Sequence, residues 1–431
     1  MKKIAFHTLG CKLNYSETSA ISKMFPQSEY QIVDFKEEAD YYVINSCSVT
    51  QLAEKKTKTA AKQAKKRNPN AKVTVMGCFP QLNPDKLSEL EAVDLVLGND
   101  DKFNILEYIQ NPESERATEV HVSNINKIKR FFPSYSFGDR TRSFLKVQDG
   151  CDHFCTYCSI PMARGRSRSA NVDNTIAKAA EIGKTDVKEI ILTGVNIGDF
   201  GKGSDESFYD LLVKLEKVEG IERIRISSVE PELLTDEIVD LVANSKVFLP
   251  HFHLPLQSGS DATLKDMKRF YDTALYADRV NKIKSVLPDA CIAADLIVGF
   301  PTETEENFAE TKQFIVNLPI SYVHVFTYSE RQNTRALSFK NVVSPAEKKK
   351  RSQALHLLSD RKKNVFYREN IGRKCSVLFE GNIIETDNGE KLISGWTDNY
   401  IKVYTKYDEA LVNKIEEVEL KDEFYEDGFL V

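Results

Sequence analysis

Three cysteines lie close together in the segment GCDHFCTYC, at Cys151, Cys155 and Cys158. Thiolates with this spacing on one short loop can ligate three irons of a 4Fe-4S cubane, which leaves the fourth iron open to chemistry. A structural zinc site with His153 as fourth ligand is the alternative. Structural zinc usually has two separated ligand pairs, however, and the sequence has no partner C-x2-C pair. The spacing therefore favours an iron-sulfur cluster.

A second set of cysteines is dispersed, with Cys11 in TLGCKLN, Cys47 in INSCSVT and Cys78 in VMGCFPQ. Each follows the carboxyl end of a predicted strand, and those ends lie along one edge of a parallel sheet, so the three thiols should converge. We expect a second three-cysteine cluster, with three inert buried thiols as the alternative. The remaining two, Cys291 and Cys375, lie inside apolar β-rich runs, which predicts small core residues.

Short strands alternate with helices over the first 110 residues. Apolar β-rich runs predict strands at 3–9, 41–45, 72–76 and 93–97, and polar periodic stretches predict helices at 14–24, 51–67 after a Thr50 cap, and 101–109. This alternation is typical of an α/β fold with a doubly wound parallel sheet.

The alternation resumes in the central region. Strands are predicted at 144–148, 189–193, 223–227, 250–256, 291–298 and 322–327, with helices at 172–182, 208–217, 235–244, 261–285 and 305–317. Six strand-helix units predict a partial (β/α)6 barrel with active residues at the carboxyl ends of its strands. A basic helix from 345 to about 369 leads to short β-rich runs, which predict a small antiparallel β-barrel.

The composition of the 431 residues, 41% hydrophobic and 29% charged, excludes collagen-like, low-complexity and wholly disordered classes. No apolar run approaches the roughly 18 residues that span a bilayer, and the amino terminus lacks a signal-peptide core. The sequence thus predicts a cytoplasmic protein with no membrane segment, whose eight cysteines are not disulfide-bonded. The net charge is −5, yet residues 55–67 hold seven basic and no acidic side chains, so a local anionic partner is not excluded.

These features together resemble a known family. The C-x3-C-x2-C loop on a six-unit barrel resembles the radical S-adenosylmethionine (SAM) superfamily, and the upstream triad with a small terminal β-domain resembles its methylthiotransferase family. The stretches FHTLGCKLN, INSCSVT and GWTDNYIKV are most similar to the MtaB-type branch, which acts on threonylcarbamoyladenosine in tRNA. The isopentenyladenosine branch typically has Gln where this sequence has Lys12.

The resemblance covers essentially the whole chain and implies four parts. These are a methylthiotransferase domain with an auxiliary cluster at 1–115, a linker at 116–140, a radical SAM partial barrel at 141–368, and a TRAM RNA-binding domain at 369–431.

Two 4Fe-4S clusters and SAM are the cofactors that the resemblance implies. Cys151, Cys155 and Cys158 would hold the SAM-binding cluster, and the dispersed triad the auxiliary cluster. Cleavage of SAM would give a 5'-deoxyadenosyl radical that removes hydrogen from carbon 2 of the adenine, where a methylthio group is then joined. The expected product is 2-methylthio-threonylcarbamoyladenosine beside the anticodon. The resemblance does not identify the catalytic side chains beyond the cluster ligands.

Loops after the next barrel strands supply the candidate SAM contacts. In LTGVNIG the superfamily places backbone contacts to the SAM amino group, with an ordinary strand-to-helix turn as the alternative. The segments SSVEP and LQSGS are expected to reach the ribose and carboxylate of SAM, although the glutamate of SSVEP has loop capping as its alternative. The candidates are Thr193, Gly194, Asn196, Glu230, Gln257 and Ser258.

A tRNA substrate, an electron donor and a sulfur donor are the expected partners, and the sequence does not identify either donor. Four lysines at 55, 58, 62 and 65 share one helix face, which suits a phosphate track or simply a solvated face. One of Arg164, Arg166 and Arg168 is expected to pair with the threonyl carboxylate. Trp396 and Tyr400 are candidates for base stacking, with core packing as the alternative.

Other functions remain open at this point. The same cysteine layout suits a methylthiotransferase that acts on isopentenyladenosine in tRNA or on a ribosomal-protein aspartate. A rival of another class is a non-catalytic, zinc-containing RNA-binding protein, in which both triads are structural.

Overall fold

The computed structural model describes residues 1–48, 50–112, 117–137 and 141–431. The chain divides into two compact units. The first comprises Met1–Phe137, Phe144–Phe154 and Cys158–Ala170, and the second comprises Gly138–Ser143, Cys155–Tyr157 and Asn171–Val431. Within the described ranges, every helix is too short or too polar to cross a membrane.

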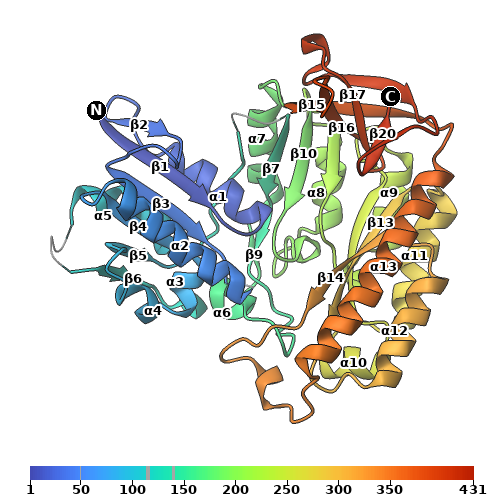
Figure 1. The fold of residues 1–431 in the computed structure, drawn as a ribbon, viewed down its shortest axis with the longest axis horizontal. Coiled ribbons are helices and arrows are strands. Elements are labelled where there is room, and N and C mark those ends of the chain that lie inside the picture. Colours follow the sequence, from blue (N-terminus) through green and yellow to red (C-terminus); the bar gives the residue numbers. More distant parts are fainter. Residues whose placement is uncertain (49, 113–116, 138–140) are drawn as a thin grey trace. The chain divides into compact units, whose positions relative to one another are not determined.

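A six-stranded parallel sheet forms the centre of the first unit, in the order β2-β1-β3-β4-β5-β6 (Figure 1). Its strands are β1 (Lys2–Thr8), β2 (Tyr30–Val33), β3 (Tyr41–Ser46), β4 (Lys72–Gly77), β5 (Leu95–Leu97) and β6 (Glu119–His121). Its helices are α1 (Lys12–Ser22), α2 (Gln51–Arg67), α3 (Cys78–Leu82), α4 (Asp85–Ser88), α5 (Ile105–Gln110) and α6 (Ile160–Arg164), with 3-10 turns η1 (Asp101–Asn104) and η2 (Ile125–Lys127). A short antiparallel pair, β8 (Gln148–Asp149) and β9 (Arg168–Ser169), completes this unit.

Apolar side chains cover both faces of this sheet because successive strand residues point to opposite sides. Tyr42 and Ile44 of β3 pack with the alanines of α2, whereas Val43 packs with Ile21 of α1 on the other face. Thr50 caps α2 through its side chain, as predicted. The result is a rigid support for the loops that follow the carboxyl ends of the strands.

Two strands of the six-stranded sheet, β2 and β6, were not predicted. Strand β2 is short and half-exposed, so it carries no apolar run for sequence reasoning to detect. Strand β6 has three residues and lies within residues 116–140, which were expected to be a linker. It extends the sheet by pairing with β5 through backbone hydrogen bonds, which do not depend on side-chain identity.

Parallel strands also dominate the second unit. Strands β10 (Glu189–Thr193) and β11 (Arg223–Ile226) pair in parallel, and a second sheet has the order β12-β13-β14. Strand β7 (Arg142–Lys146) is divided between the two units after Ser143. Isolated parallel bridges Ile224↔Phe248 and Ser228↔His253 connect β11 to the second sheet. The strands of that second sheet are β12 (His251–Gln257), β13 (Cys291–Val298) and β14 (Tyr322–Thr327).

Helices follow these strands in alternation, as expected. They are α7 (Val172–Gly183), α8 (Phe208–Leu215), α9 (Asp236–Asn244), α10 (Asp261–Asp266), α11 (Thr273–Val286) and α12 (Glu305–Asn317), with 3-10 turns η3 (Ile197–Asp199), η4 (Pro231–Leu233) and η5 (Arg335–Ser338). The single helix predicted at 261–285 is two helices. Lys268 has a positive φ of 61°, which ends α10, and Asp272 caps α11 by accepting a hydrogen bond from the Leu275 amide.

Helix α13 (Pro345–Glu369) leads to a mixed sheet in the order β18-β15-β16-β17-β20-β19. The strands are β15 (Lys374–Glu385), β16 (Lys391–Thr397), β17 (Lys402–Lys406), β18 (Ile415–Glu419), β19 (Phe424–Tyr425) and β20 (Gly428–Leu430), with η6 (Glu409–Leu411) between β17 and β18. Their pairing is antiparallel as predicted, except that β17 and β20 are parallel. Cys291 and Cys375 are buried in one apolar cluster, which confirms their prediction as core residues.

Trp396 and Tyr400 contact each other within the second unit. Their rings stack at 4.4 Å, and the guanidinium of Arg225, on β11, lies 4.7 Å from the Tyr400 ring centre. Arg223 and Arg225 also donate to backbone carbonyls of the terminal sheet, including that of Trp396. Intramolecular packing therefore describes these two aromatic residues better than the predicted base stacking.

Candidate functional site

The dispersed cysteines come together at one edge of the first unit's sheet. They follow β1, β3 and β4, which are neighbours, and the register pairs Thr8 with Asn45 and Ser46 with Gly77. Burial raises the pKa of the Cys11 thiol, and the nearby Cys78 adds to this rise. Gly10 lies against Cys47, since a Cβ added at Gly10 would be 2.6 Å from the Cys47 Cβ. The structure thus brings the loops that carry these three cysteines to one edge of the sheet, and their role as cluster ligands stays a prediction.

Two asparagines hold the cysteine loops in place. Asn14 donates to the carbonyls of Leu9 (2.9 Å) and Ser46 (3.1 Å), and its Oδ1 lies 3.8 Å from the Cys11 Sγ. Asn99 lies 3.6 Å from the Cys78 Sγ through its Nδ2, which also donates to the Ala163 carbonyl at 2.7 Å. Sequence reasoning missed both residues, although Asn14 follows Cys11 by only three positions.

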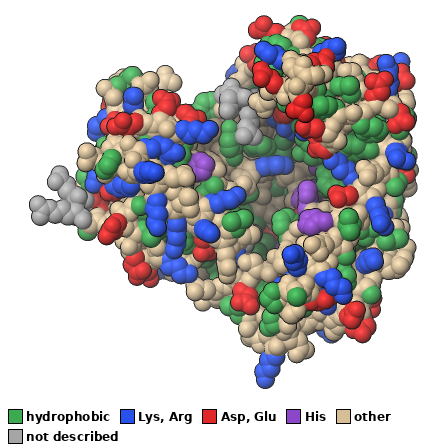
Figure 2. Space-filling view, viewed as in Figure 1, with side chains coloured by type: hydrophobic (Ala, Val, Ile, Leu, Met, Phe, Trp, Pro, Cys, Tyr) green, Lys and Arg blue, Asp and Glu red, His purple; other side chains and the backbone are tan. Residues whose placement is uncertain are grey.

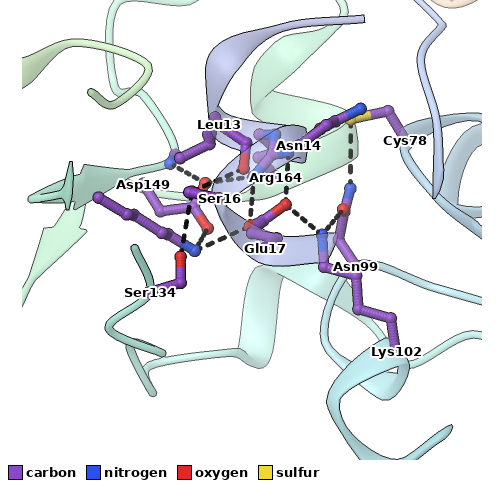
Figure 3. Close-up of polar contacts among 12 residues, drawn as sticks. Leu13, Asn14, Ser16, Glu17, Cys78, Asn99, Lys102, Ser134, Asp149 and Arg164 are labelled. Atoms are coloured by element: carbon purple, nitrogen blue, oxygen red, sulfur yellow. Dashed lines mark hydrogen bonds and ion pairs between the residues drawn. The ribbon is translucent and has the colours of Figure 1, made fainter. Parts of the chain in front are cut away.

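A buried ionic network lies directly beside this triad (Figure 3). Glu17 accepts from Lys102 (2.6 Å), Lys146 (2.8 Å) and Arg164 (3.1 Å). Asp149 accepts from the same Lys146 (2.8 Å) and Arg164 (3.0 Å), and from Arg168 at 3.2 Å. The side chains of Glu17 and Lys102 are fully buried, and those of Lys146 and Arg164 are 1% and 2% exposed.

The two carboxylates of the network are ionised despite their burial. Burial by itself would raise the pKa of the Glu17 carboxyl, but Arg164, Lys102 and Lys146 outweigh it and hold that pKa well below the usual range. Burial also opposes ionisation of Asp149, and Lys146 with Arg164 likewise lowers the pKa of this carboxyl. Leaving one of these charges without its partners would be strongly destabilising, so the set must fold as a unit.

This network corrects one expectation about the arginines. The buried guanidinium of Arg164 donates to Glu17, Asp149 and Asn14, so it is not available to pair with a substrate carboxylate. Arg168 is similarly held, by Asp149 and by backbone carbonyls. Arg166 also pairs with a carboxylate, that of Asp152 at 3.4 Å, but its side chain is 63% exposed and its guanidinium lies 4.6 Å from the Phe154 ring. Of the three arginines predicted to pair with the threonyl carboxylate, only Arg166 stays a candidate.

The clustered cysteines lie between β8 and α6. In the first unit the Cys151 amide donates to the Gly165 carbonyl at 3.0 Å. The thiols of Cys151 and Cys158 accept from backbone amides two residues further along, at 3.5 and 3.4 Å. These contacts shape the loop locally and orient sulfur atoms that can serve as metal ligands.

Cys155 belongs to the second unit, where it contacts Arg269. The Arg269 Nη1 lies 3.0 Å from the Cys155 Sγ, and its Nη2 pairs with Glu230. Burial raises the pKa of the Cys155 thiol, and Arg269 opposes that effect. Burial likewise raises the pKa of Glu230 to about 7 against the influence of Arg269. The guanidinium thus joins a candidate cluster ligand to a candidate SAM contact.

Arg269 was not predicted from the sequence. It follows the positive-φ Lys268 in the turn between α10 and α11, and its Nε lies 3.2 Å from the Tyr271 hydroxyl. Tyr271 donates in turn to the carbonyls of Pro255 and Leu256 on β12. A lone arginine in KRFYD carries no local signal, because Cys155 and Glu230 lie 114 and 39 positions away in the sequence.

The other predicted SAM contacts lie at or after the carboxyl ends of parallel strands of the second unit. Thr193 is the last residue of β10 and is buried, as is Asn196, which precedes η3. Gln257 ends β12 at a β-bulge with a φ of 63°. Ser258 is buried, and its hydroxyl lies 3.2 Å from that of Thr311 on α12. The Ser258 side chain therefore has a partner within the protein. Gly194 is half-buried.

The lysine face of α2 is only partly free. Lys55 and Lys62 are exposed, whereas Lys65 forms a 2.8 Å ion pair with Asp94 and Lys58 lies over the Phe79 ring. Figure 2 shows Lys and Arg side chains gathered on the side of the first unit that carries α2.

Residues 145–315 match the radical SAM superfamily, and residues 3–98 match a family described as uncharacterized protein family UPF0004. A solved structure of the radical SAM methyltransferase TsrM from Kitasatospora setae has a similar fold, with a TM-score of 0.54 and 12% identity over 75% of this chain and 73% of that one. The parallel strands and the clustered cysteine loop therefore define a radical SAM enzyme.

Curated relatives refine this class. A threonylcarbamoyladenosine tRNA methylthiotransferase MtaB from Bacillus subtilis is 40% identical over 97% of this chain and 94% of its own length, and one from Thermotoga maritima is 38% identical over 93% and 91%. A tRNA-2-methylthio-N(6)-dimethylallyladenosine synthase from Clostridium perfringens is 32% identical over 96% and 94%. The chain belongs to the MtaB-type family of radical SAM methylthiotransferases.

Proposed function

We propose that this protein methylthiolates carbon 2 of threonylcarbamoyladenosine next to the anticodon of tRNA, giving 2-methylthio-threonylcarbamoyladenosine. The observation that carries the proposal is the convergence of Cys11, Cys47 and Cys78 at one sheet edge, in a chain that also has the radical SAM cysteine loop. The threonylcarbamoyladenosine relatives are 34–40% identical and the dimethylallyladenosine relatives 32–33%, which favours the former substrate.

The residues present fit two 4Fe-4S clusters. Each set offers three thiols, the donor set of a cubane with one open iron. Gly10 leaves beside Cys47 the space that a Cβ would fill. When bound, the cluster on Cys151, Cys155 and Cys158 would supply the electron that cleaves SAM to a radical able to remove the carbon 2 hydrogen, and the auxiliary cluster would supply the sulfur.

The protein's own side chains would hold and orient these groups. Arg269 would hold the Cys155 thiolate in place through a charge-assisted contact, and it would hold Glu230 in place through an ion pair. Glu230 would then present its other oxygen to a SAM hydroxyl, while Thr193, Gly194, Asn196, Gln257 and Ser258 would contact SAM mainly through their backbone. Positioning of the reactants, rather than acid-base chemistry, would be the contribution of these residues.

The finer architecture is part of the same proposal. The strand order and the bridges between the two parallel sheets of the second unit support a partial (β/α)6 barrel at 141–368, and the mixed terminal sheet supports a TRAM domain at 369–431. The first 115 residues would be the domain of the auxiliary cluster. An electron donor and a sulfur donor would be needed in the cytoplasm.

The experiment that tests the proposal is mass spectrometry of nucleosides from tRNA carrying threonylcarbamoyladenosine. The tRNA is incubated anaerobically with reconstituted protein, SAM, sulfide and a strong reductant. A new methylthio-threonylcarbamoyladenosine peak supports the proposal. Deoxyadenosine without that peak on this tRNA, but with product on isopentenyladenosine tRNA, would reassign the substrate. Bound zinc without iron would instead favour the non-catalytic RNA-binding protein.

A further inference from the structure

The buried network contacts both the auxiliary triad and the strand that leads to the SAM-cluster loop. Arg164 donates to Asn14 at 2.6 Å, and Asn14 contacts Cys11. Lys102 donates to the Asn99 Oδ1 at 2.9 Å, and Asn99 contacts Cys78. One amide therefore separates each of these two cations from a cysteine of the triad (Figure 3).

The network carries an excess of positive charge. Its cations are Lys102, Lys146, Arg164 and Arg168, and its carboxylates are Glu17 and Asp149, so its formal charge is 4 − 2 = +2. Buried charge is costly unless it is paired, and an excess of buried cations calls for a nearby anion. The thiolates of Cys11 and Cys78, which contact Asn14 and Asn99, would supply negative charge of the required sign together with the cluster that they would hold.

The same network reaches the SAM-cluster loop through Asp149. The Gly150 amide donates to the Asp149 Oδ1 at 2.9 Å, and Cys151 is the next residue. Cys151 is fixed from the other side by the Gly165 carbonyl, which directly follows Arg164. Arg164 and Asp149 thus hold Cys151 in a fixed position relative to Cys11 and Cys78 within the first unit.

We propose that Arg164 is a positioning residue and that the buried cations of this network are the counter-charge of the auxiliary cluster. The network sets the reduction potential of that cluster and, within the first unit, connects its cysteine loops to the Cys151 loop. This inference rests on the proposed auxiliary cluster. It adds the residues that tune the cluster, which are not its ligands.

The test uses the full chain with Cys151, Cys155 and Cys158 changed to Ala, so that only the auxiliary site can hold iron. After anaerobic reconstitution, the midpoint potential of the cluster is measured by redox titration followed by electron paramagnetic resonance. Arg164→Met and Lys102→Met each remove one buried cation and should shift the potential to more negative values. Glu17→Gln removes a buried anion and should shift it to more positive values.

Lys72→Met is the matched control. Lys72 starts β4, at the other end of the strand from Cys78, and its side chain is 49% exposed, so solvent screens its charge. This control should leave the potential unchanged. Removal of a buried cation and removal of a buried anion should shift the potential in opposite directions. A merely structural role does not predict this, because loosened packing does not depend on the sign of the charge that was removed.

The possible failures of the test are distinguishable. If the starting variant, with Cys151, Cys155 and Cys158 changed to Ala, binds no iron, the proposed auxiliary cluster is wrong. The counter-charge inference, which rests on that cluster, is then wrong as well. If it binds about four iron per chain but the buried variants leave the potential in place or all shift it one way, only the counter-charge role is overturned. Circular dichroism checks that each variant folds. If Arg164→Met does not fold, the two single variants Lys102→Met and Glu17→Gln test the counter-charge role by the sign of their potential shifts.

Discussion

The guanidinium of Arg269 lies 3.0 Å from the Cys155 thiol, although the two residues are 114 positions apart in the chain. Arg269 also pairs with Glu230, and its side chain is 3% exposed. A cation held so close to a sulfur favours the thiolate, which is the form that ligates iron. This contact makes Arg269 the non-ligand residue with the most direct access to the SAM-binding cluster in the second unit.

Changing Arg269→Gln should lower both iron retention and SAM cleavage about 10- to 100-fold, the usual cost of losing a partner of a metal ligand. Iron content and deoxyadenosine formation are the measurements. Arg279→Gln is the control, because Arg279 pairs with Asp236 on the helical side of the same unit. Equal losses in both variants would contradict a specific role for Arg269.

The two cysteine sets should separate two partial activities. Cys155→Ala should abolish deoxyadenosine formation, since SAM cleavage needs that cluster. Cys47→Ala should retain deoxyadenosine formation but yield no methylthio nucleoside, because the sulfur source is lost. Both products can be quantified by mass spectrometry in one reaction, and methylthio product from the Cys47 variant would disprove the auxiliary-cluster assignment.

Gly10→Ala should selectively damage the auxiliary site. The added Cβ would lie 2.6 Å from the Cys47 Cβ, and Gly10 has a φ of +102°. We expect loss of about half the bound iron, with the SAM-binding cluster retained. Gly372→Ala is the matched control, because its φ is +81° and no atom lies within 4 Å of the added Cβ. It should cost only about 1 kcal/mol of stability, so iron loss there would refute the steric argument.

Glu230 should make the metal-free protein less stable as the pH rises. Its pKa of about 7 in the folded protein exceeds the ordinary value of 4.5, so the folded state holds the proton more tightly. Its contribution is therefore fully present below about pH 4.5 and is lost as the pH rises through about 7, by roughly 3 kcal/mol at most. Chemical unfolding at several pH values should show a smaller decline in Glu230→Gln, whereas the exposed-site variant Glu222→Gln should keep it.

Reversing the exposed charges of α2 should weaken binding of tRNA. In Lys55→Glu/Lys62→Glu, the lost phosphate contacts should reduce the slope of log K against log salt by about 0.7 to 0.9 per contact. Binding assays at several salt concentrations measure this slope. The double variant Lys265→Glu/Lys312→Glu makes the same charge change at exposed sites of α10 and α12 and should leave the slope unchanged. An equal effect of both pairs would indicate only a response to net charge.

The sequence by itself determined the cysteine sets, the order of strands and helices, and most of their limits. Strands β10, β13 and β14 and helices α12 and α13 have the predicted bounds, because alternation, apolar runs and caps are local signals. The convergence of Cys11, Cys47 and Cys78 was also predictable, since equivalent loops of a parallel sheet must share an edge. Short edge strands such as β2 and β6 carry no such pattern and were missed.

Only the tertiary structure decided what the charged and aromatic side chains do. One of Arg164, Arg166 and Arg168 was expected to pair with a substrate carboxylate, but Arg164 is buried against Glu17, 147 positions earlier in the chain. Arg269 gave no signal, and Trp396 packs on Tyr400 within the protein. Spacing along the chain specifies which residues share a loop or a helix face. The partner of a long polar side chain depends instead on which distant segments the folded core brings beside it, and on the need to neutralise each buried charge.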